Sequence, residues 1–123
     1  MAPLALAYVG DTVYDLFIRT MLVENTTLTP HALHKKSSNF VCAHGQTEAF
    51  YRIESLLTEE EMSIFKRGRN AHSGTIPKNA SVSDYRTATG FEALLGFLFL
   101  SKREERLQQL IKKAVENTNE TGE

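Results

Sequence analysis

The chain has 123 residues, of which 41% are hydrophobic and 24% charged, and this length and composition predict one globular domain of the ordinary soluble type. Its formal net charge of -1 argues against a generally basic nucleic-acid binder, although residues 66–86 hold five Lys or Arg against one acid. The single Cys42 excludes an intrachain disulfide and favours a cytoplasmic location, and no apolar run reaches the roughly 20 residues of a membrane span.

Hydrophobic periodicity predicts an all-α chain, because the alternating patterns typical of strands are absent. The expected helices cover residues 3–23, 29–56, 58–72, 83–102 and 104–117. The second is expected to break at 34–38, and the third opens with a capping box at Thr58–Glu61. Residues 74–83 predict a loop. We expect one domain over 1–117 and a polar, disordered tail over 118–123.

Two acidic residues, Asp11 and Glu92, lie on helices that are apolar on most sides, where an unpartnered carboxylate is costly to bury. Gly10 precedes the first acid, and Gly96 follows the second by one turn. Glycine inside a helix costs about 1 kcal/mol relative to alanine. Close approach of two backbones is a common reason for it, so we expect these helices to cross near the two acids.

Two interpretations of this acidic pair remain open at this point. In the first, a divalent cation with oxygen ligands lies between Asp11 and Glu92, since magnesium typically uses one or two protein carboxylates. In the second, each acid forms an ion pair with an arginine such as Arg19 or Arg86. The four histidines have no metal-ligand spacing and are interpreted as ordinary helix or surface residues.

A basic segment, residues 66–72 (KRGRNAH), ends the third expected helix and leads into a loop that carries Lys78 and Asn79. Such a cluster can bind phosphates, which position a nucleic acid without reading its sequence. It can also be a solvated helix face, with cations favoured by the helix C-terminus. The loop lacks the aromatic residues of a single-strand stacking platform, which weakly favours a duplex.

Five segments of the chain resemble the ribonuclease III family. Residues 6–15 (LAYVGDTVYD) resemble its signature helix, which centres on a Gly-Asp pair, and residues 91–100 (FEALLGFLFL) resemble its second signature. Residues 34–38 (HKKSS), 66–71 (KRGRNA) and 77–79 (PKN) are similar to the Mini-III branch of that family. The resemblance extends over nearly the whole chain, and the five segments occur in the family's order.

The resemblance implies an all-helical ribonuclease III endonuclease-domain fold that dimerises through its signature helices. It implies hydrolysis of double-stranded RNA to 5′-phosphate and 3′-hydroxyl ends, with Mg²⁺, or Mn²⁺ in its place, held by Asp11 and Glu92. The expected substrate is a stem in the precursor of bacterial large-subunit ribosomal RNA. Tyr8 matches a position that packs an aromatic ring into the partner subunit in larger relatives.

The chain departs from larger family members, which carry glutamates at the positions of Leu4 and Ala7 and an aspartate at that of Thr89. The Mini-III branch shares the change at Thr89, and we expect Asp15 and Thr89 as outer-shell groups. No double-stranded-RNA-binding domain follows residue 117, so the catalytic domain is expected to grip its own substrate. The expected RNA contacts are Lys66, Arg67, Arg69, Asn70, Lys78, Asn79 and Arg86.

Two alternative functions are compatible with the same residues. The first is a non-catalytic double-stranded-RNA-binding protein on this fold, although a binder needs no anions next to phosphate. The second is a helical interaction module without nucleic acid, in which the basic segment is only a solvated face. Salt-dependent binding to duplex RNA distinguishes this second alternative from the other functions.

Overall fold

The structure is a computed structural model that describes residues 1–71 and 81–121. Regular structure in these two ranges is entirely helical, which confirms the expected all-α fold. The elements are α1 (Pro3–Asn25), α2 (Pro30–Val41), α3 (Ala43–Ile53), the short 3-10 helix η1 (Glu54–Leu56), α4 (Glu59–Asn70), α5 (Val82–Leu100) and α6 (Glu104–Thr121). No helix among the described residues is long and apolar enough to span a bilayer.

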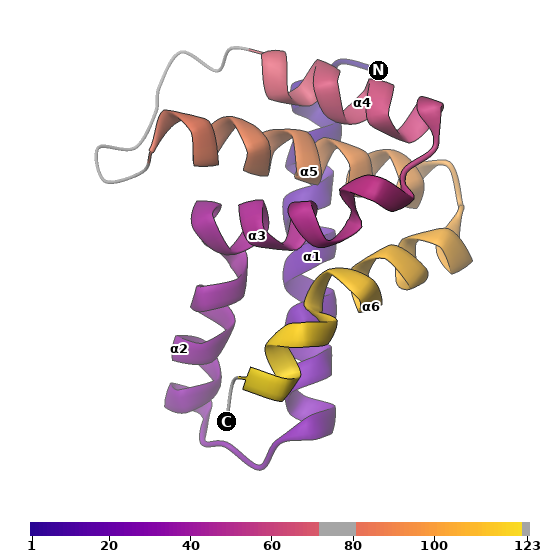
Figure 1. The fold of residues 1–123 in the computed structure, drawn as a ribbon. Helices are drawn as coiled ribbons and strands as arrows, with labels where there is room; N and C mark the ends of the chain where they lie inside the picture. Colours follow the sequence, from indigo (N-terminus) through magenta and orange to yellow (C-terminus); the bar gives the residue numbers. More distant parts are fainter. Residues whose placement is uncertain (72–80, 122–123) are drawn as a thin grey trace.

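Helix α5 is the centre of the fold and packs against α1, α3, α4 and α6. In Figure 1, α1 runs behind the other helices, α5 crosses it at a steep angle, and α4 lies alongside α5. Because α5 is covered on several sides, its residues are apolar nearly all round, as the sequence predicts. The buried rings of Phe50 and Phe65 stack at 3.8 Å, which joins α3 to α4 in the core.

The structure places the break in the second expected helix at Cys42, so the prediction of a break at 34–38 was wrong. Ser37 and Ser38 donate their hydroxyls to the carbonyl of His34, and the helix tolerates them. Cys42 has extended backbone, ends α2, and caps α3 by accepting a hydrogen bond from the Gly45 N–H at 3.4 Å. The 34–38 segment is therefore an ordinary part of α2.

The other helix boundaries lie within a few residues of their predicted positions. Helix α1 extends to Asn25, and α4 ends at Asn70. Helix α5 ends at Leu100 rather than at Lys102, whose positive φ of 62° is incompatible with a continuing helix. Helix α6 reaches Thr121, four residues past its expected end, and the placement of 118–123 in a disordered tail stays a prediction.

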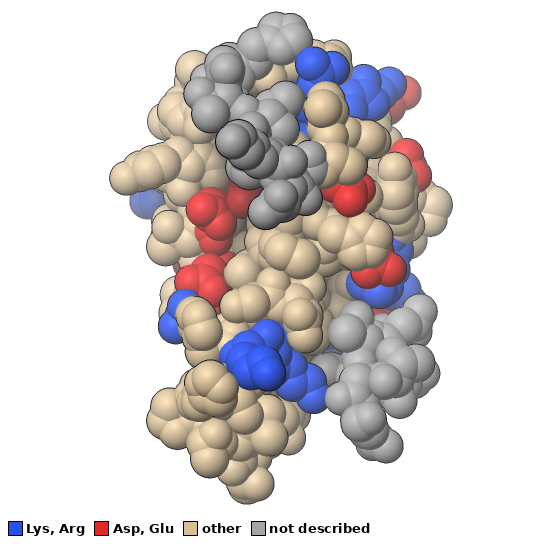
Figure 2. Space-filling view, turned by 90° about the vertical axis from the view of Figure 1, so that its left-hand side faces the viewer, with Lys and Arg blue, Asp and Glu red and all other residues tan. Residues whose placement is uncertain are grey.

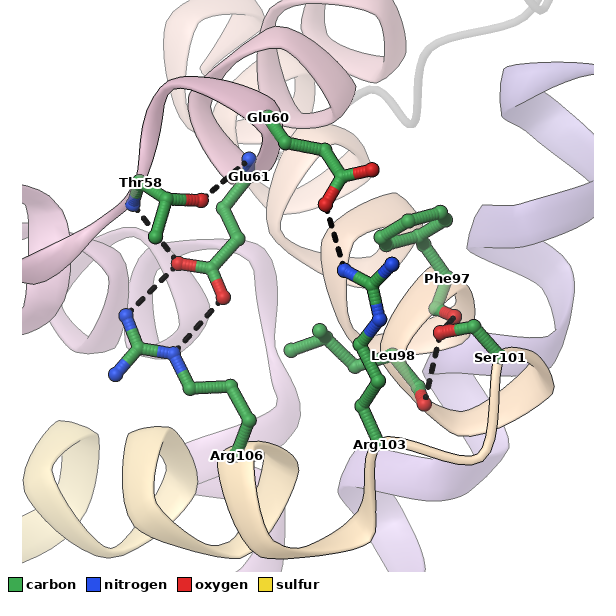
Figure 3. A network of polar contacts seen from close by, with 8 residues as sticks. All are labelled: Thr58, Glu60, Glu61, Phe97, Leu98, Ser101, Arg103 and Arg106. Atoms are coloured by element: carbon green, nitrogen blue, oxygen red, sulfur yellow. Dashed lines mark hydrogen bonds and ion pairs between the residues drawn. The ribbon is translucent and has the colours of Figure 1, made fainter.

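A polar network fixes the start of α4 against α6 (Figure 3). The Glu61 carboxylate, with its side chain only 4% exposed, accepts two hydrogen bonds from Arg106 at 2.8 Å and one from the Thr58 N–H at 2.9 Å. The Arg106 hydrogen bonds are the main reason why the pKa of Glu61 is lowered. Arg103 pairs with Glu60 at 2.6 Å. With its N-terminus fixed, α4 holds its basic C-terminal end in a defined place.

Candidate active site

The site is built where α1 and α5 touch through two glycines. A Cβ atom on Gly10 would meet the carbonyl oxygen of Glu92, and it would lie 2.6 Å from that carbonyl's carbon and 2.9 Å from the Gly96 nitrogen. A Cβ atom on Gly96 would similarly meet the backbone of Leu6, 2.8 Å from its carbonyl carbon. The backbones are therefore in direct contact, which confirms the predicted crossing and brings residue 11 beside residue 92.

The Asp11 and Glu92 carboxylates are close enough to influence each other's charge. The pKa of Glu92 is raised to about 8, first because the side chain is largely buried and then because of the nearby Asp11 carboxylate. A hydrogen bond from Gln46 opposes this shift. Asp11 is exposed on α1, so the desolvation falls on Glu92.

The ion-pair interpretation of this acidic pair is not what the structure contains. Arg19 binds Asp15, one turn along α1, with an Nε–Oδ1 distance of 3.0 Å. None of the ion pairs formed between the described residues includes Asp11 or Glu92. The hydrogen-bond donor to Glu92 is the neutral amide of Gln46, at 3.0 Å.

The two acids open into a cleft of about 670 Å³ between α1, α3 and α5. Its lining includes Asp11, His44, Gln46, Asp84, Thr89 and Glu92. Figure 2 shows this side of the molecule, with acidic side chains at mid-height and the larger patches of Lys and Arg above and below them. An acidic centre with basic flanks suits a substrate whose backbone is anionic and whose cleavage requires a cation.

Asp11 and Glu92 are the two carboxylates that meet in this cleft. Among the described residues, no group of three His, Cys, Asp or Glu side chains is arranged to hold a metal. This donor set fits magnesium, which keeps several water ligands and uses one or two carboxylates. Of the two expected outer-shell residues, Thr89 lines the cleft, with its hydroxyl donating to the Tyr85 carbonyl at 2.9 Å. Asp15 does not line it.

The three cations Lys66, Arg67 and Arg69, here called the basic cluster, lie at the C-terminal end of α4. Arg69 is half-buried, with its guanidinium 5.7 Å from the Phe65 ring centre and its Nε 3.2 Å from the side-chain oxygen of Asn70. The two other members of the cluster are exposed, as is Arg86 on α5. Lys78 and Asn79 lie outside the described residues.

Arg67, a member of the basic cluster, also borders a second, apolar groove that is lined by Leu6, Ile64 and Phe97 among others. Tyr8, the predicted interface residue, is 83% exposed on α1, and Leu4 and Leu16 on the same helix are also exposed. One face of α1 therefore presents apolar side chains to the surroundings of the single chain.

Sequence reasoning missed two members of the site, Gln46 and His44. Gln46 is 2% exposed and opens the buried stripe of Ala49, Phe50 and Ile53, so a polar residue at the start of an apolar stripe was the available signal. The Nδ1 atom of His44 lies 3.2 Å from Asp84, a contact across 40 residues that no local pattern announces. The interpretation of His44 as an ordinary surface residue omitted this place at the cleft.

Comparison with known proteins agrees with this geometry. The family model described as the Ribonuclease III domain matches residues 4–103. The Mini-ribonuclease 3 of Clostridium tetani is 45% identical over 100% of this chain and 82% of its own length. That of Staphylococcus aureus is 46% identical over 96% of this chain and 90% of its own length. An X-ray structure of a protein from Fusobacterium nucleatum superposes with a TM-score of 0.85 at 29% identity, covering 96% of this chain and 94% of that one.

An acidic pair at the crossing of two helices, on a fold that matches this family over most of its length, defines an endoribonuclease. The chain belongs to the ribonuclease III family, within its Mini-ribonuclease 3 branch.

Proposed function

We propose that this endoribonuclease hydrolyses phosphodiesters in double-stranded RNA with Mg²⁺ as its cofactor, leaving 5′-phosphate and 3′-hydroxyl ends; Mn²⁺ can substitute. The observation that carries the proposal is the contact between the Asp11 and Glu92 carboxylates beside an open cleft. Two neighbouring anions repel unless a cation lies between them, and the high pKa of Glu92 in the metal-free chain expresses that repulsion together with burial.

Asp11 and Glu92 would hold the cation, with water and RNA phosphate oxygens completing its ligands. When bound, Mg²⁺ would lower the pKa of a coordinated water molecule and stabilise the negative charge that develops on the phosphate. The chain's own residues exclude bulk water from one side of Glu92 and orient its carboxylate. We keep Thr89 and Asp15 as proposed outer-shell groups, of which Thr89 is better placed because it lines the cleft.

The proposed RNA-binding residues are the basic cluster together with Asn70, Arg86 and the loop positions Lys78 and Asn79. The cations of the cluster stand at the end of a helix whose start is fixed by buried ion pairing, so they present charge at a defined place. Lys and Arg contacts to phosphates supply affinity without sequence preference. Double-stranded RNA suits such contacts, since proteins recognise it largely by shape and backbone.

We propose a symmetric homodimer as the active species. Each chain provides one pair of carboxylates, whereas a duplex has two strands related by a local two-fold axis. The exposed Tyr8, between the exposed Leu4 and Leu16, supports an interface along α1, because apolar side chains gathered on one helix face favour burial against a partner. This arrangement would bring two clefts to opposite strands of one RNA.

The proposed substrate is a stem in the precursor of large-subunit ribosomal RNA, and the proposed site of action is the bacterial cytoplasm. The support is the similarity to relatives named Mini-ribonuclease 3 in several bacteria. The enzyme would act there without contact with a membrane.

Incubation of long duplex RNA with the purified chain, with and without Mg²⁺, tests the proposed reaction. Asp11→Asn and Glu92→Gln should each reduce the cleavage rate by at least about 100-fold, because each removes one of two ligand charges, while duplex binding stays near the wild-type value. Glu24→Gln removes an exposed acid from the same helix as Asp11 and is the matched control. Cleavage at the wild-type rate by either site variant contradicts the assignment.

A further inference from the structure

Gln46 is a buried amide that joins three helices at the wall of the cleft. Its Nε2 atom donates to the Val41 carbonyl at 2.9 Å and to the Glu92 carboxylate at 3.0 Å. Both partners are acceptors, so the amide must present its NH₂ group to them. The remaining oxygen, Oε1, is then buried without a hydrogen-bond partner among the described residues.

We propose that Gln46 is a positioning residue that holds the Glu92 carboxylate in the orientation needed to share a divalent cation with Asp11. The inference rests on the proposed function, because it concerns the same metal site. Gln46 reaches the carboxylate from α3, whereas Asp11 approaches from α1. The donated hydrogen bond occupies the Oε2 atom of Glu92 and restrains the rotation of the whole group.

The chemistry of a neutral amide suits this position. Lysine or arginine would neutralise Glu92 and compete with the metal, and a further carboxylate would repel it. An amide donates a hydrogen bond without adding charge, so the pair Asp11 and Glu92 keeps its attraction for a cation. Removing a group that orients a metal ligand in this way commonly weakens metal binding.

The buried Oε1 atom separates this role from simple packing. A methionine or leucine at position 46 would fill the same space, 2% exposed, without leaving an oxygen unpaired. An unpaired buried acceptor is unfavourable, so the fold tolerates this amide for what its NH₂ group does. The hydrogen bond to the Val41 carbonyl does not by itself explain a buried amide at position 46. That carbonyl lies at the end of α2, next to the exposed Cys42.

The test uses Mn²⁺ alone, with binding followed by the electron paramagnetic resonance signal of the free ion. Gln46→Met keeps the length of the side chain and removes both donors, and we expect Mn²⁺ to bind about 10–100-fold more weakly. Thr47→Val is the matched control, because it removes a neighbouring buried hydroxyl that bonds the Ala43 and Asp84 carbonyls and not Glu92. Its Mn²⁺ affinity should stay within about twofold of wild type, and thermal unfolding verifies that both variants are folded.

If Gln46→Met does not fold, Gln46→Asn replaces it, since this shorter amide cannot span both acceptors, and the same weakening is expected. Wild-type Mn²⁺ affinity in the folded variant overturns the inference and leaves the proposed function standing. A crystal structure of the variant with the Glu92 carboxylate unmoved also overturns it. If Asp11→Asn binds Mn²⁺ as wild type does, the proposed metal site itself is wrong, and the inference fails with it.

Discussion

Replacing Gly10 by alanine tests whether the contact between α1 and α5 creates the active site. The added Cβ would lie 2.6 Å from the Glu92 carbonyl carbon and 2.9 Å from the Gly96 nitrogen, and both are backbone atoms that cannot rotate away. Carbon atoms pack at about 3.5 Å or more, so the helices must separate by about 1 Å. Overpacking costs about 1–3 kcal/mol, whereas the better helix propensity of alanine returns about 1 kcal/mol.

The expected net effect of Gly10→Ala is a loss of about 1 kcal/mol of unfolding free energy and a fall in melting temperature of roughly 3–6 °C. A displacement of 1 Å between Asp11 and Glu92 should slow cleavage by about 100-fold. Thermal unfolding and single-turnover cleavage of duplex RNA measure the two effects. Ser63→Ala, at an exposed position of α4, is the control. A stable, fully active Gly10→Ala variant would refute the reasoning.

Four other predictions address the charges and surfaces of the molecule. The pKa of Glu92 is about 8 against an ordinary 4.5, so the unfolded chain releases this proton at lower pH than the folded chain does. Without metal, the free energy of unfolding should therefore fall as the pH rises from 4.5 through about 8. A Glu92→Gln variant with the same pH profile would contradict this. Arg106→Met leaves the buried Glu61 without its ion-pair partner and should lower the free energy of unfolding, measured in urea, by about 3 kcal/mol. A loss under about 1 kcal/mol would disprove that this pair fixes the start of α4 against α6. Alanine at all three positions of the basic cluster should weaken duplex binding and flatten its dependence on salt by up to about 3 in the log–log slope. An unchanged slope would assign the RNA to another surface. Tyr8→Glu should yield monomers in light scattering, whereas the exposed Tyr51→Glu on α3 should not; a Tyr8→Glu dimer argues against an interface along α1.

Much of the fold could be predicted from the sequence because its signals are local. Pro30 after Thr29, and the glutamates after Thr58, mark helix starts that the structure confirms. The break between α2 and α3 was misplaced because serines that disfavour a helix on average were satisfied within it, while the extended backbone of Cys42 depends on how α3 packs.

The candidate site, too, could be predicted from the sequence only in part. Asp11 and Glu92 were identifiable from acids and glycines on apolar helices. Their unequal burial, and the donation from Gln46, were not, because each arises from contacts between helices more than 40 residues apart.

By itself the sequence determined the all-α class, the approximate limits of most helices, and the two acids, one next to Gly10 and the other one turn before Gly96. These follow from side-chain periodicity and capping, which act over a few residues. Tertiary structure alone decided that the acidic pair faces the cleft and that Gln46 is the group that donates a hydrogen bond to Glu92. The physical reason is that charge pairing and desolvation depend on distances in space, which only the packed helices set.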